Sequence, residues 1–330
     1  MSHPSKTGVP IIDIRPLQSP PSPERDTIDQ QLGVAGKEIG AAVLTGLPET
    51  AVLTIKRAAQ LNAFFELPLK EKMALALNRT DPSSNRYWRG YMNRLNSGWI
   101  VNEMYDIGRQ KAAIGVNDFK GYEMIAEETP FPINMPQSWL EDILAYDQTM
   151  FEVSLLIIRS LARYLGKAEE HAVARFTNHN STLRLLNYPL PPTSKDYVDS
   201  TVDMHQHNGQ TRAEIGNAHT DAACLSFLWQ TPGGGLQAQA RNGEWLDVPR
   251  LEGACSVHMG EAFGTMTDDV MPATPHRVLS TGAARQAIGF FLEPAIHASV
   301  TPWPNLGEAE APIKPSERYG PWILNRYGYV

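Results

Sequence analysis

The feature that most constrains the fold is a series of short apolar segments between residues 182 and 292, separated by turn signals. Asn242-Gly243 stands between two of them and favours a tight hairpin turn, and Pro232-Gly233-Gly234-Gly235 marks another turn. Evenly spaced short strands of this kind are typical of a sandwich or barrel. The sequence therefore predicts a mainly β core with strands at 182–189, 225–229, 236–241, 244–248, 255–259 and 287–292.

The chain before this β-rich part has mainly helical patterns. Apolar side chains recur at helical spacing over 28–39 and 53–65, and the longest such pattern runs from Trp139 to Leu165 and stops at Gly166. We expect this long helix to be the scaffold against which the sheet packs. Shorter elements are expected as strands at 9–14 and 41–46 and as helices at 69–76 and 315–326.

The predicted fold class is α+β with a double-sheet jelly roll, because only a sheet that folds over itself brings side chains from separate strands together. With 330 residues and 42% apolar residues, the chain can form a sizeable core. We expect four regions. They are a helical and strand region at 1–135 that packs on the barrel, scaffold helices at 136–180, the jelly-roll core at 181–300, and a C-terminal tail and helix at 301–330.

Composition argues against several partners. The net charge of −7 argues against a nucleic-acid partner, and no window of 18 uninterrupted apolar residues predicts a membrane span. The first residues contain no apolar stretch typical of a secretory signal. Cys224 and Cys255 lie in apolar runs and are expected as buried thiols, which suits the reducing cytoplasm. The sequence does not indicate an oligomeric state.

His219-x-Asp221 is the first candidate for chemistry, because side chains two apart on a strand point to the same side. His276 is the candidate for a third ligand. Two imidazoles and one carboxylate on one face of a metal leave positions open, an arrangement that suits non-heme Fe(II) oxygenases. Arg285 follows in its own strand-like segment and could hold a carboxylate in bidentate fashion. His219-x-Asp221 taken alone is more often a surface pair or a satisfied hydrogen bond.

Two polar stretches have alternative interpretations. Residues 84–108 mix aromatics with arginines, and we expect a surface loop at 85–91 rather than a lid over a substrate. The stretch 190–217 contains His205-Gln206-His207, which we interpret as part of a polar insertion loop rather than as a second metal site. Residues 84–101 and 190–217 are the candidates for determining the substrate. Four arginines in or near them could hold an anionic substrate, although each is expected to be structural: Arg89, Arg94, Arg184 and Arg212.

Taken together, several segments resemble the isopenicillin N synthase-like group of Fe(II)/2-oxoglutarate-dependent oxygenases, over nearly the whole chain. Each segment alone is a weak signal, but the set is strong. The segments are Val9 to Ile14, Phe64 to Lys72, Glu103 to Gly108, Leu183 to Pro189, Ala218 to Asp221 and Thr274 to Val278.

This resemblance implies a distorted jelly roll, also called a double-stranded β-helix. It implies that Fe(II) is held by His219, Asp221 and His276. It also implies that Arg285 pairs with the far carboxylate of 2-oxoglutarate and that Tyr188 helps to hold this co-substrate. The implied activity uses O2 to hydroxylate, desaturate or cyclise a small-molecule substrate, and the family suggests natural-product biosynthesis.

Two positions depart from the family. Ala287 stands where the family usually has Ser, and Leu186 where it often has Asn, so two polar contacts to 2-oxoglutarate are missing. A lost neutral hydrogen bond costs on the order of 1 kcal/mol, and we expect weaker co-substrate binding. Three rivals stay open at this point. They are an iron-dependent oxidase of the same family that does not use 2-oxoglutarate, a Zn(II) hydrolase and a non-enzymatic ligand-binding protein.

Overall fold

The computed structural model describes the whole chain except residues 1–7, 97, 109–120, 191–201, 311 and 330. Its described strands form two sheets. The larger sheet has the order β1-β2-β11-β8-β13-β5-β4-β3 and the smaller one β10-β9-β12-β7-β6. The strands of the larger sheet are β1 (Ile11–Asp13), β2 (Ala41–Thr45), β3 (Gly90–Asn96), β4 (Trp99–Gly108), β5 (Thr182–Tyr188), β8 (Leu225–Gln230), β11 (Cys255–Met259) and β13 (Arg285–Leu292). Those of the smaller sheet are β6 (Met204–His207), β7 (Gln210–His219), β9 (Leu236–Gln239), β10 (Trp245–Asp247) and β12 (His276–Leu279).

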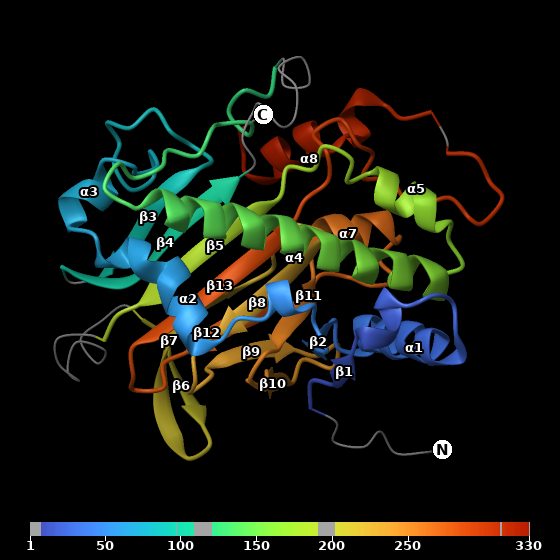
Figure 1. Cartoon of the computed structure of the whole chain (residues 1–330), viewed down its shortest axis with the longest axis horizontal. Helices are drawn as coiled ribbons and strands as arrows, with labels where there is room; N and C mark the ends of the chain where they lie inside the picture. The colour runs from blue at the N-terminus through green and yellow to red at the C-terminus, as the bar shows by residue number, and fades with distance from the viewer. Residues whose placement is uncertain (1–7, 97, 109–120, 191–201, 311, 330) are drawn as a thin grey trace.

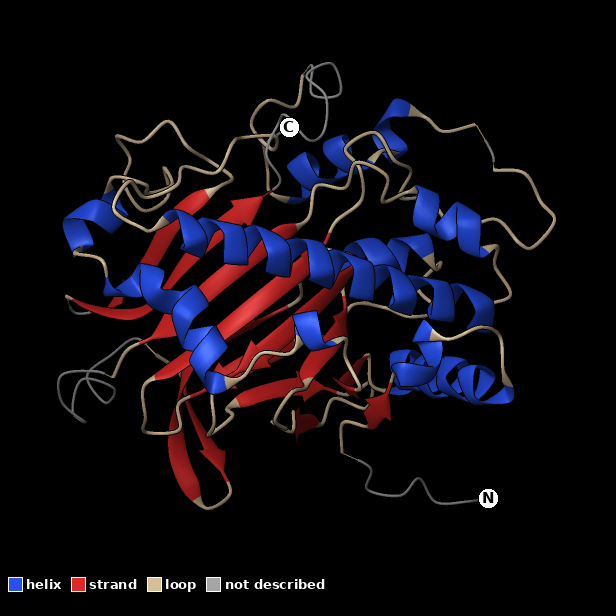
Figure 2. Ribbon diagram, viewed as in Figure 1, coloured by secondary structure: helices blue, strands red, loops and turns tan. Residues whose placement is uncertain are grey.

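The strand order confirms the predicted jelly roll. From β7 to β13 the chain passes repeatedly from one sheet to the other, so that β7, β9, β10 and β12 lie in the smaller sheet and β8, β11 and β13 in the larger. Two sheets connected in this way face each other across a shared interior. Figure 2 shows the strands as one curled β body with the helices gathered around it.

The helices cover the outer face of the larger sheet. The longest, α4, runs across that sheet in Figure 1 and buries one apolar side against it, including Ile157, Ile158 and Leu161. This element confirms the predicted scaffold helix. The described helices are α1 (Pro23–Glu38), α2 (Ile55–Leu61), α3 (Leu69–Met73), α4 (Gln137–Tyr164), α5 (Glu169–Ala174), α7 (Glu261–Met266) and α8 (Tyr319–Arg326).

The alternation along each strand separates the two sides of the larger sheet. In β5, Leu183 and Leu185 belong to the core under the helices, whereas Leu186 and Tyr188 belong to the core between the sheets. Arg184 shares the inner side with Leu186 and Tyr188, as the spacing predicted. The interior between the sheets therefore receives both apolar and polar side chains, and the candidate site lies there.

The expected surface loop at 85–91 extends only to Arg89, because β3 begins at Gly90 and pairs with β4 at the edge of the larger sheet. Tyr91 and Tyr105 are fully buried, and the ring of Tyr105 stacks on Phe64 with 4.0 Å between centroids. The contacts that fix this hairpin come from residues far away in sequence. The mixed pattern of aromatics and arginines could not reveal them.

The expected polar insertion loop at 190–217 is also wrong where the structure describes it. Residues 204–219 form the hairpin β6–β7, which turns at Asn208 and Gly209, both with positive φ. Asn-Gly is the same turn signal that predicted the bend at 242–243. Residues 191–201 lie outside the described part of the chain. The division into four regions stays a prediction, although β1 to β4 share the larger sheet with the core strands.

Among the described residues, we find no helix that combines the length and the apolar content needed to cross a membrane.

Candidate metal centre

The three predicted metal ligands come together at one end of the barrel. His219 ends β7, His276 begins β12, and the two stand opposite each other in the ladder of the smaller sheet. Asp221 lies just beyond β7, where the chain turns towards β8. Its carboxylate oxygens lie 3.4 Å from His219 Nε2 and 3.5 Å from His276 Nε2. Their ligand atoms all lie within 4.8 Å of one another, and no other such group occurs in the described residues.

Both histidines present the same ring nitrogen to this space. His219 Nδ1 lies 2.6 Å from the carbonyl of Asn217, and His276 Nδ1 lies 3.2 Å from the carbonyl of Thr274. A carbonyl oxygen can only accept, so each Nδ1 carries the proton and each Nε2 keeps its lone pair. This fixes the tautomer that a metal ligand needs.

Asp221 stays ionised in this setting. The hydroxyl of Ser226 on β8 donates to Asp221 Oδ2 at 2.5 Å. Burial acts to raise the pKa of Asp221, but the interactions with the neighbouring imidazoles of His276 and His219 and this hydrogen bond hold it well below its usual range. Burial lowers the pKa of His276. An ionised carboxylate and a neutral imidazole are the forms that coordinate a divalent metal.

A fourth histidine, which sequence reasoning missed, lies beside the set. His258 on β11 is buried, and its ring centroid lies 5.1 Å from that of His276. Its Nε2 lies 3.0 Å from the hydroxyl of Ser256, and burial lowers the pKa of His258 to about 3. The sequence feature that could have revealed His258 is its position within the apolar strand segment 255–259. This neutral ring forms part of the wall behind His276.

Arg285 reaches the same interior from the start of β13. Its guanidinium lies 4.8 Å from the ring centroid of Tyr188, which stands opposite it on β5. Nε donates to the carbonyl of Gly234 at 3.0 Å and Nη2 to Gln230 Oε1 at 3.3 Å, whereas Nη1 is buried without a hydrogen-bond partner. A buried donor without an acceptor is costly. A carboxylate placed against Nη1 would satisfy it.

The two departures from the family pattern also face this interior. Ala287 and Leu186 are cross-strand partners, and both belong to the apolar core between the sheets. Neither supplies a polar contact beside Arg285.

A cavity of about 320 Å³ has two of the three candidate ligands, His219 and Asp221, in its wall. The loop before β3 and the C-terminal segment after α8 form much of the rest, through Tyr87, Trp88, Tyr327 and Tyr329. The volume is at the small end of the range of about 300–1,000 Å³ that is usual for ligand pockets. None of the described residues of 190–217 lines this cavity. The predicted role of that stretch in determining the substrate is therefore not seen there.

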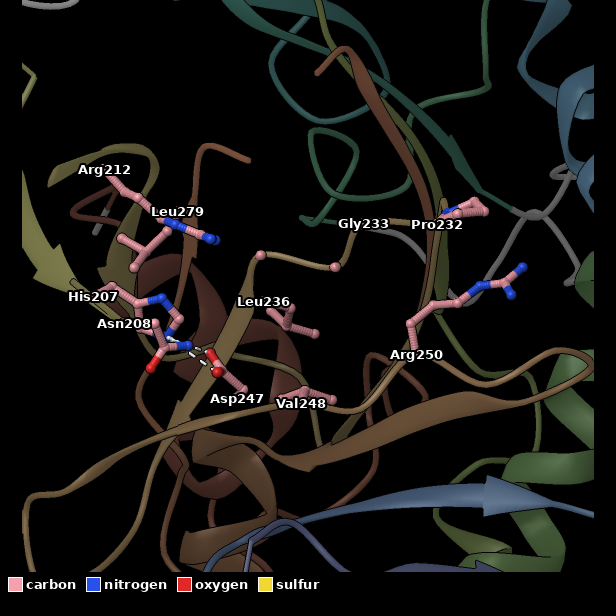
Figure 3. Close-up of a pocket in the computed structure, with 12 residues that line it drawn as sticks. His207, Asn208, Arg212, Pro232, Gly233, Leu236, Asp247, Val248, Arg250 and Leu279 are labelled. Carbon is pink, nitrogen blue, oxygen red and sulfur yellow. Dashed lines mark hydrogen bonds and ion pairs between the residues drawn. The ribbon is translucent and has the colours of Figure 1, made fainter. Parts of the chain in front are cut away.

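A larger cavity, of about 570 Å³, lies elsewhere and contains none of the three candidate ligands. It is bounded by the β6–β7 turn and by the glycine-rich turn 232–235 (Figure 3). In that view His207 points at the carboxylate of Asp247, and Arg250 points away from the other labelled side chains. His207 Nε2 lies 2.9 Å from Asp247 Oδ1.

The two hairpin histidines have different carboxylate partners among the described residues. His205 pairs with Glu214 at 2.7 Å, and Arg277 also lies 3.5 Å from Glu214. His207 pairs with Asp247 instead, so the two histidines have separate partners.

The arginines considered from the sequence have protein partners. Arg184 makes two bonds to Asp106, at 2.6 and 2.8 Å. The others bond to backbone or side-chain oxygens: Arg89 to Thr182 and Asn180, Arg94 to Asn217 and Ile215, and Arg212 to Gln210. Sequence reasoning missed Arg79, which lines the cavity beside His219 and Asp221.

Two family models match this chain. Residues 181–294 match the 2OG-Fe(II) oxygenase superfamily, and residues 9–130 match the non-haem dioxygenase in morphine synthesis N-terminal family. The first match contains His219, Asp221, His276 and Arg285.

Individual proteins are similar over most of their length. A 2-oxoglutarate-Fe(II) type oxidoreductase from Emericella nidulans, hxnY, is 28% identical over 86% of this chain and 79% of its own. Isopenicillin N synthase from Streptomyces jumonjinensis is 24% identical over 96% of this chain and 93% of its own. The structure of Neurospora crassa T7H with alpha-KG and thymine aligns with this chain at a TM-score of 0.75. The alignment covers 98% of each chain with 19% sequence identity, so the two proteins have the same fold.

Proposed function

The chain belongs to the 2OG-Fe(II) oxygenase superfamily, whose enzymes use Fe(II), 2-oxoglutarate and O2, and on this premise we propose that it oxidises a small-molecule substrate at the His219, Asp221 and His276 site. The observation that carries the proposal is the convergence of these three ligand atoms within 4.8 Å, beside an arginine with a free buried donor. The outcome is hydroxylation, desaturation or ring closure of the substrate.

In this proposal His219 Nε2, His276 Nε2 and the Asp221 carboxylate hold Fe(II). Both imidazoles are kept in the correct tautomer by backbone carbonyls, and Asp221 is oriented by Ser226. Three protein ligands on one face leave the other coordination positions to co-substrate and O2. Iron bound there supplies the redox chemistry that couples oxidative decarboxylation of 2-oxoglutarate to oxidation of the substrate.

Arg285 is the proposed partner of the far carboxylate of 2-oxoglutarate. It enters the interior from the strand beside β5 and β8, it is buried, and its Nη1 meets no hydrogen-bond criterion with the described residues. Tyr188 packs against the guanidinium and fixes its orientation. The absence of a hydroxyl at Ala287 is consistent with weaker binding of the co-substrate rather than with its loss, because a charge-assisted pair is stronger than a neutral hydrogen bond.

A role in specialised metabolism is part of the proposal and is supported by the similarity to isopenicillin N synthase. A cytoplasmic location is also proposed, supported by Cys224 and Cys255, which are buried and not joined to each other.

Anaerobic addition of Fe(II) and 2-oxoglutarate to the protein tests the site, because the chelate absorbs visible light. We expect a band with the wild type and none with Asp221→Ala, and succinate formation once O2 and a substrate are supplied. No band and no succinate would contradict the proposal. Substrate oxidation with 2-oxoglutarate omitted would identify the iron-dependent oxidase instead. Full activity with Zn(II) and without O2 would identify the hydrolase, and iron binding without turnover of any substrate would identify the ligand-binding protein.

A further inference from the structure

Among the described residues, one arginine in the wall of the cavity beside the metal site makes no hydrogen bond to a protein oxygen. Four arginines line the cavity, and three of them bond to oxygen atoms of the protein. These three are Arg184 with Asp106, Arg326 with Glu261, and Arg89 with Thr182 and the carbonyl of Asn180. Within the described part of the chain, the fourth, Arg79, has a hydrogen bond only to the sulfur of Met92, at 2.7 Å.

A thioether sulfur is a weak acceptor, whereas a guanidinium has five N–H donors and keeps its charge in proteins. Arg79 is exposed at the edge of the cavity, so the donors that Met92 does not engage are open to solvent. The Asp106 carboxylate is the nearest compensation, but it already receives two hydrogen bonds from Arg184. Arg79 therefore offers free donors to whatever enters the cavity.

The loop that carries Arg79 is held in place on both sides. Backbone bonds join Leu77 to Tyr91 on β3 and Asn78 to Arg86 across the loop, at 2.8 and 2.7 Å. The carboxylate of Glu127 accepts from the backbone N–H groups of Tyr87 and Trp88. Arg79 is thus positioned by the scaffold and does not belong to a freely moving segment.

Flat aromatic surfaces form the cavity wall near Arg79. Trp88 meets the ring of Tyr327 edge-on at 5.4 Å between centroids, and Tyr87 meets Tyr329 at 6.4 Å. Tyr327 lies close enough to both Arg79 and Asp221 for their charges to act on its phenol. Arg79, the aromatic rings and two of the proposed metal ligands, His219 and Asp221, therefore line one small space.

Building on the proposed function, we propose that the substrate is a small monocarboxylic acid with a flat apolar body, whose carboxylate pairs with Arg79 while the body lies among Trp88 and Tyr327 and faces the metal ligands. One free guanidinium matches one negative charge. A dianion such as a phosphate monoester would also meet the carboxyl groups of Asp106 and Glu293, which line the same cavity. A volume of about 320 Å³ suits a compact molecule.

Ligand-observed NMR titration of the full-length protein tests this substrate class without turnover. The probes are benzoate, phenylacetate and 3-phenylpropanoate, each compared with its neutral amide, in the presence of Fe(II) and saturating 2-oxoglutarate under argon. We expect at least one acid to bind about tenfold to a hundredfold more tightly than its amide, the ratio that a charge-assisted hydrogen bond gives. Equal affinities of acids and amides, or no binding of any acid, would overturn the proposal.

Variants assign the effect to the residue. Arg79→Gln should remove the preference for the acid, and Arg79→Lys should restore part of it. Arg212→Gln is the matched control, because Arg212 lies on the β6–β7 hairpin and bonds to Gln210 outside this cavity. Acid affinity that is unchanged in Arg79→Gln, with its circular dichroism and its visible band intact, would overturn the proposal.

The visible band of Fe(II) and 2-oxoglutarate, recorded on the same samples, separates the two hypotheses. A normal band without acid preference rejects the substrate class and leaves the proposed function standing. Acid binding through Arg79 without any band rejects the proposed function and leaves the anion site standing. Heptanoate tests whether the substrate needs a flat apolar body. It should bind several-fold more weakly than 3-phenylpropanoate, and equal affinities would overturn the proposed flat body.

Discussion

At the residue scale, the site depends on hydrogen bonds that select one form of each side chain. Asn217 and Thr274 carbonyls fix the two imidazole tautomers, and Ser226 fixes the Asp221 carboxylate. The sequence predicted His219, Asp221 and His276 as ligands from the His-x-Asp spacing and from two short segments that resemble the family's metal-binding segments. The supporting groups could not be identified in this way, because a carbonyl has no sequence signature and Ser226 is one serine among many.

Restoring a hydroxyl at position 287 tests the missing polar contact. Ala287 faces the interior on the same strand as Arg285, so Ala287→Ser places a hydroxyl beside the proposed carboxylate site. We expect the Kd for 2-oxoglutarate, measured by titrating the visible band, to fall about fivefold, since one neutral hydrogen bond contributes on the order of 1 kcal/mol. Ala287→Val is the control without a hydroxyl. A Kd that does not fall in the serine variant would contradict the expected contact.

Glu293 gives a pH dependence of stability. It is buried at the end of the cavity, and burial raises the pKa of Glu293 to about 7. Between the ordinary glutamate pKa and about pH 7, the folded protein therefore keeps this proton, whereas the unfolded chain releases it. The contribution of Glu293 to the free energy of unfolding therefore falls as the pH rises through that window. Glu293→Gln removes the titration. We expect its free energy of unfolding to exceed that of the wild type by a margin that grows by roughly 2 kcal/mol from pH 5 to pH 8.

Denaturant unfolding of the metal-free protein at the two pH values measures this margin. Glu252→Gln changes an exposed glutamate and is the control, for which the margin should stay near zero at both pH values. A margin for Glu293→Gln that is the same at both pH values would show that the carboxyl group is ionised throughout.

At the element scale, a chain of polar contacts connects the C-terminal helix to the metal ligands. Glu261 at the start of α7 accepts from the hydroxyl of Thr220, which stands between His219 and Asp221, and pairs with Arg326 at the end of α8. The segment that follows α8 supplies Tyr327 and Tyr329 to the cavity. Glu261 therefore ties the cover of the cavity to the segment that carries two of the three ligands.

Removing the charge at Glu261 should loosen this cover. In Glu261→Gln we expect faster amide hydrogen exchange over 319–329, with a change in the free energy of unfolding below about 1 kcal/mol because the ion pair is partly exposed. Glu317→Gln is the matched control, since it breaks the exposed Lys314–Glu317 pair nearby without any contact to Thr220. Exchange that rises equally in both variants would show that Glu261 has no special role.

Elements with strong local patterns were predictable, and those fixed by distant partners were not. The periodic α4, the Asn242-Gly243 hairpin and the strand of Tyr188 were all expected from neighbouring residues. The β3–β4 hairpin was missed because Tyr91 and Tyr105 are buried against Phe64, which belongs to a different part of the chain. The β6–β7 hairpin was missed because its strands are polar, although Asn208-Gly209 was a readable turn signal.

At the scale of the whole molecule, the metal site joins parts that the sequence keeps apart. His219 and His276 belong to the smaller sheet, whereas Asp221 leads into β8 of the larger sheet and bonds to Ser226 on it. Arg285 is on the larger sheet as well. Motifs in the sequence predicted the proposed ligand set, but they did not predict which residues form the cavity wall beside it. Arg79 and the segment 326–329 meet above the site only through tertiary packing.

Because the ligands span both sheets, metal binding should stabilise the entire fold. A ligand that binds only the folded state adds about 2.7 kcal/mol at a hundredfold excess over its Kd. We expect Fe(II) under argon to raise the Tm by several degrees, 2-oxoglutarate to raise it further only after Fe(II) is added, and a chelator to reverse both shifts. In Asp221→Ala both shifts should vanish, whereas in Arg285→Met only the second should vanish. If 2-oxoglutarate raised the Tm of Arg285→Met as much as that of the wild type, the co-substrate would have to be held by other residues.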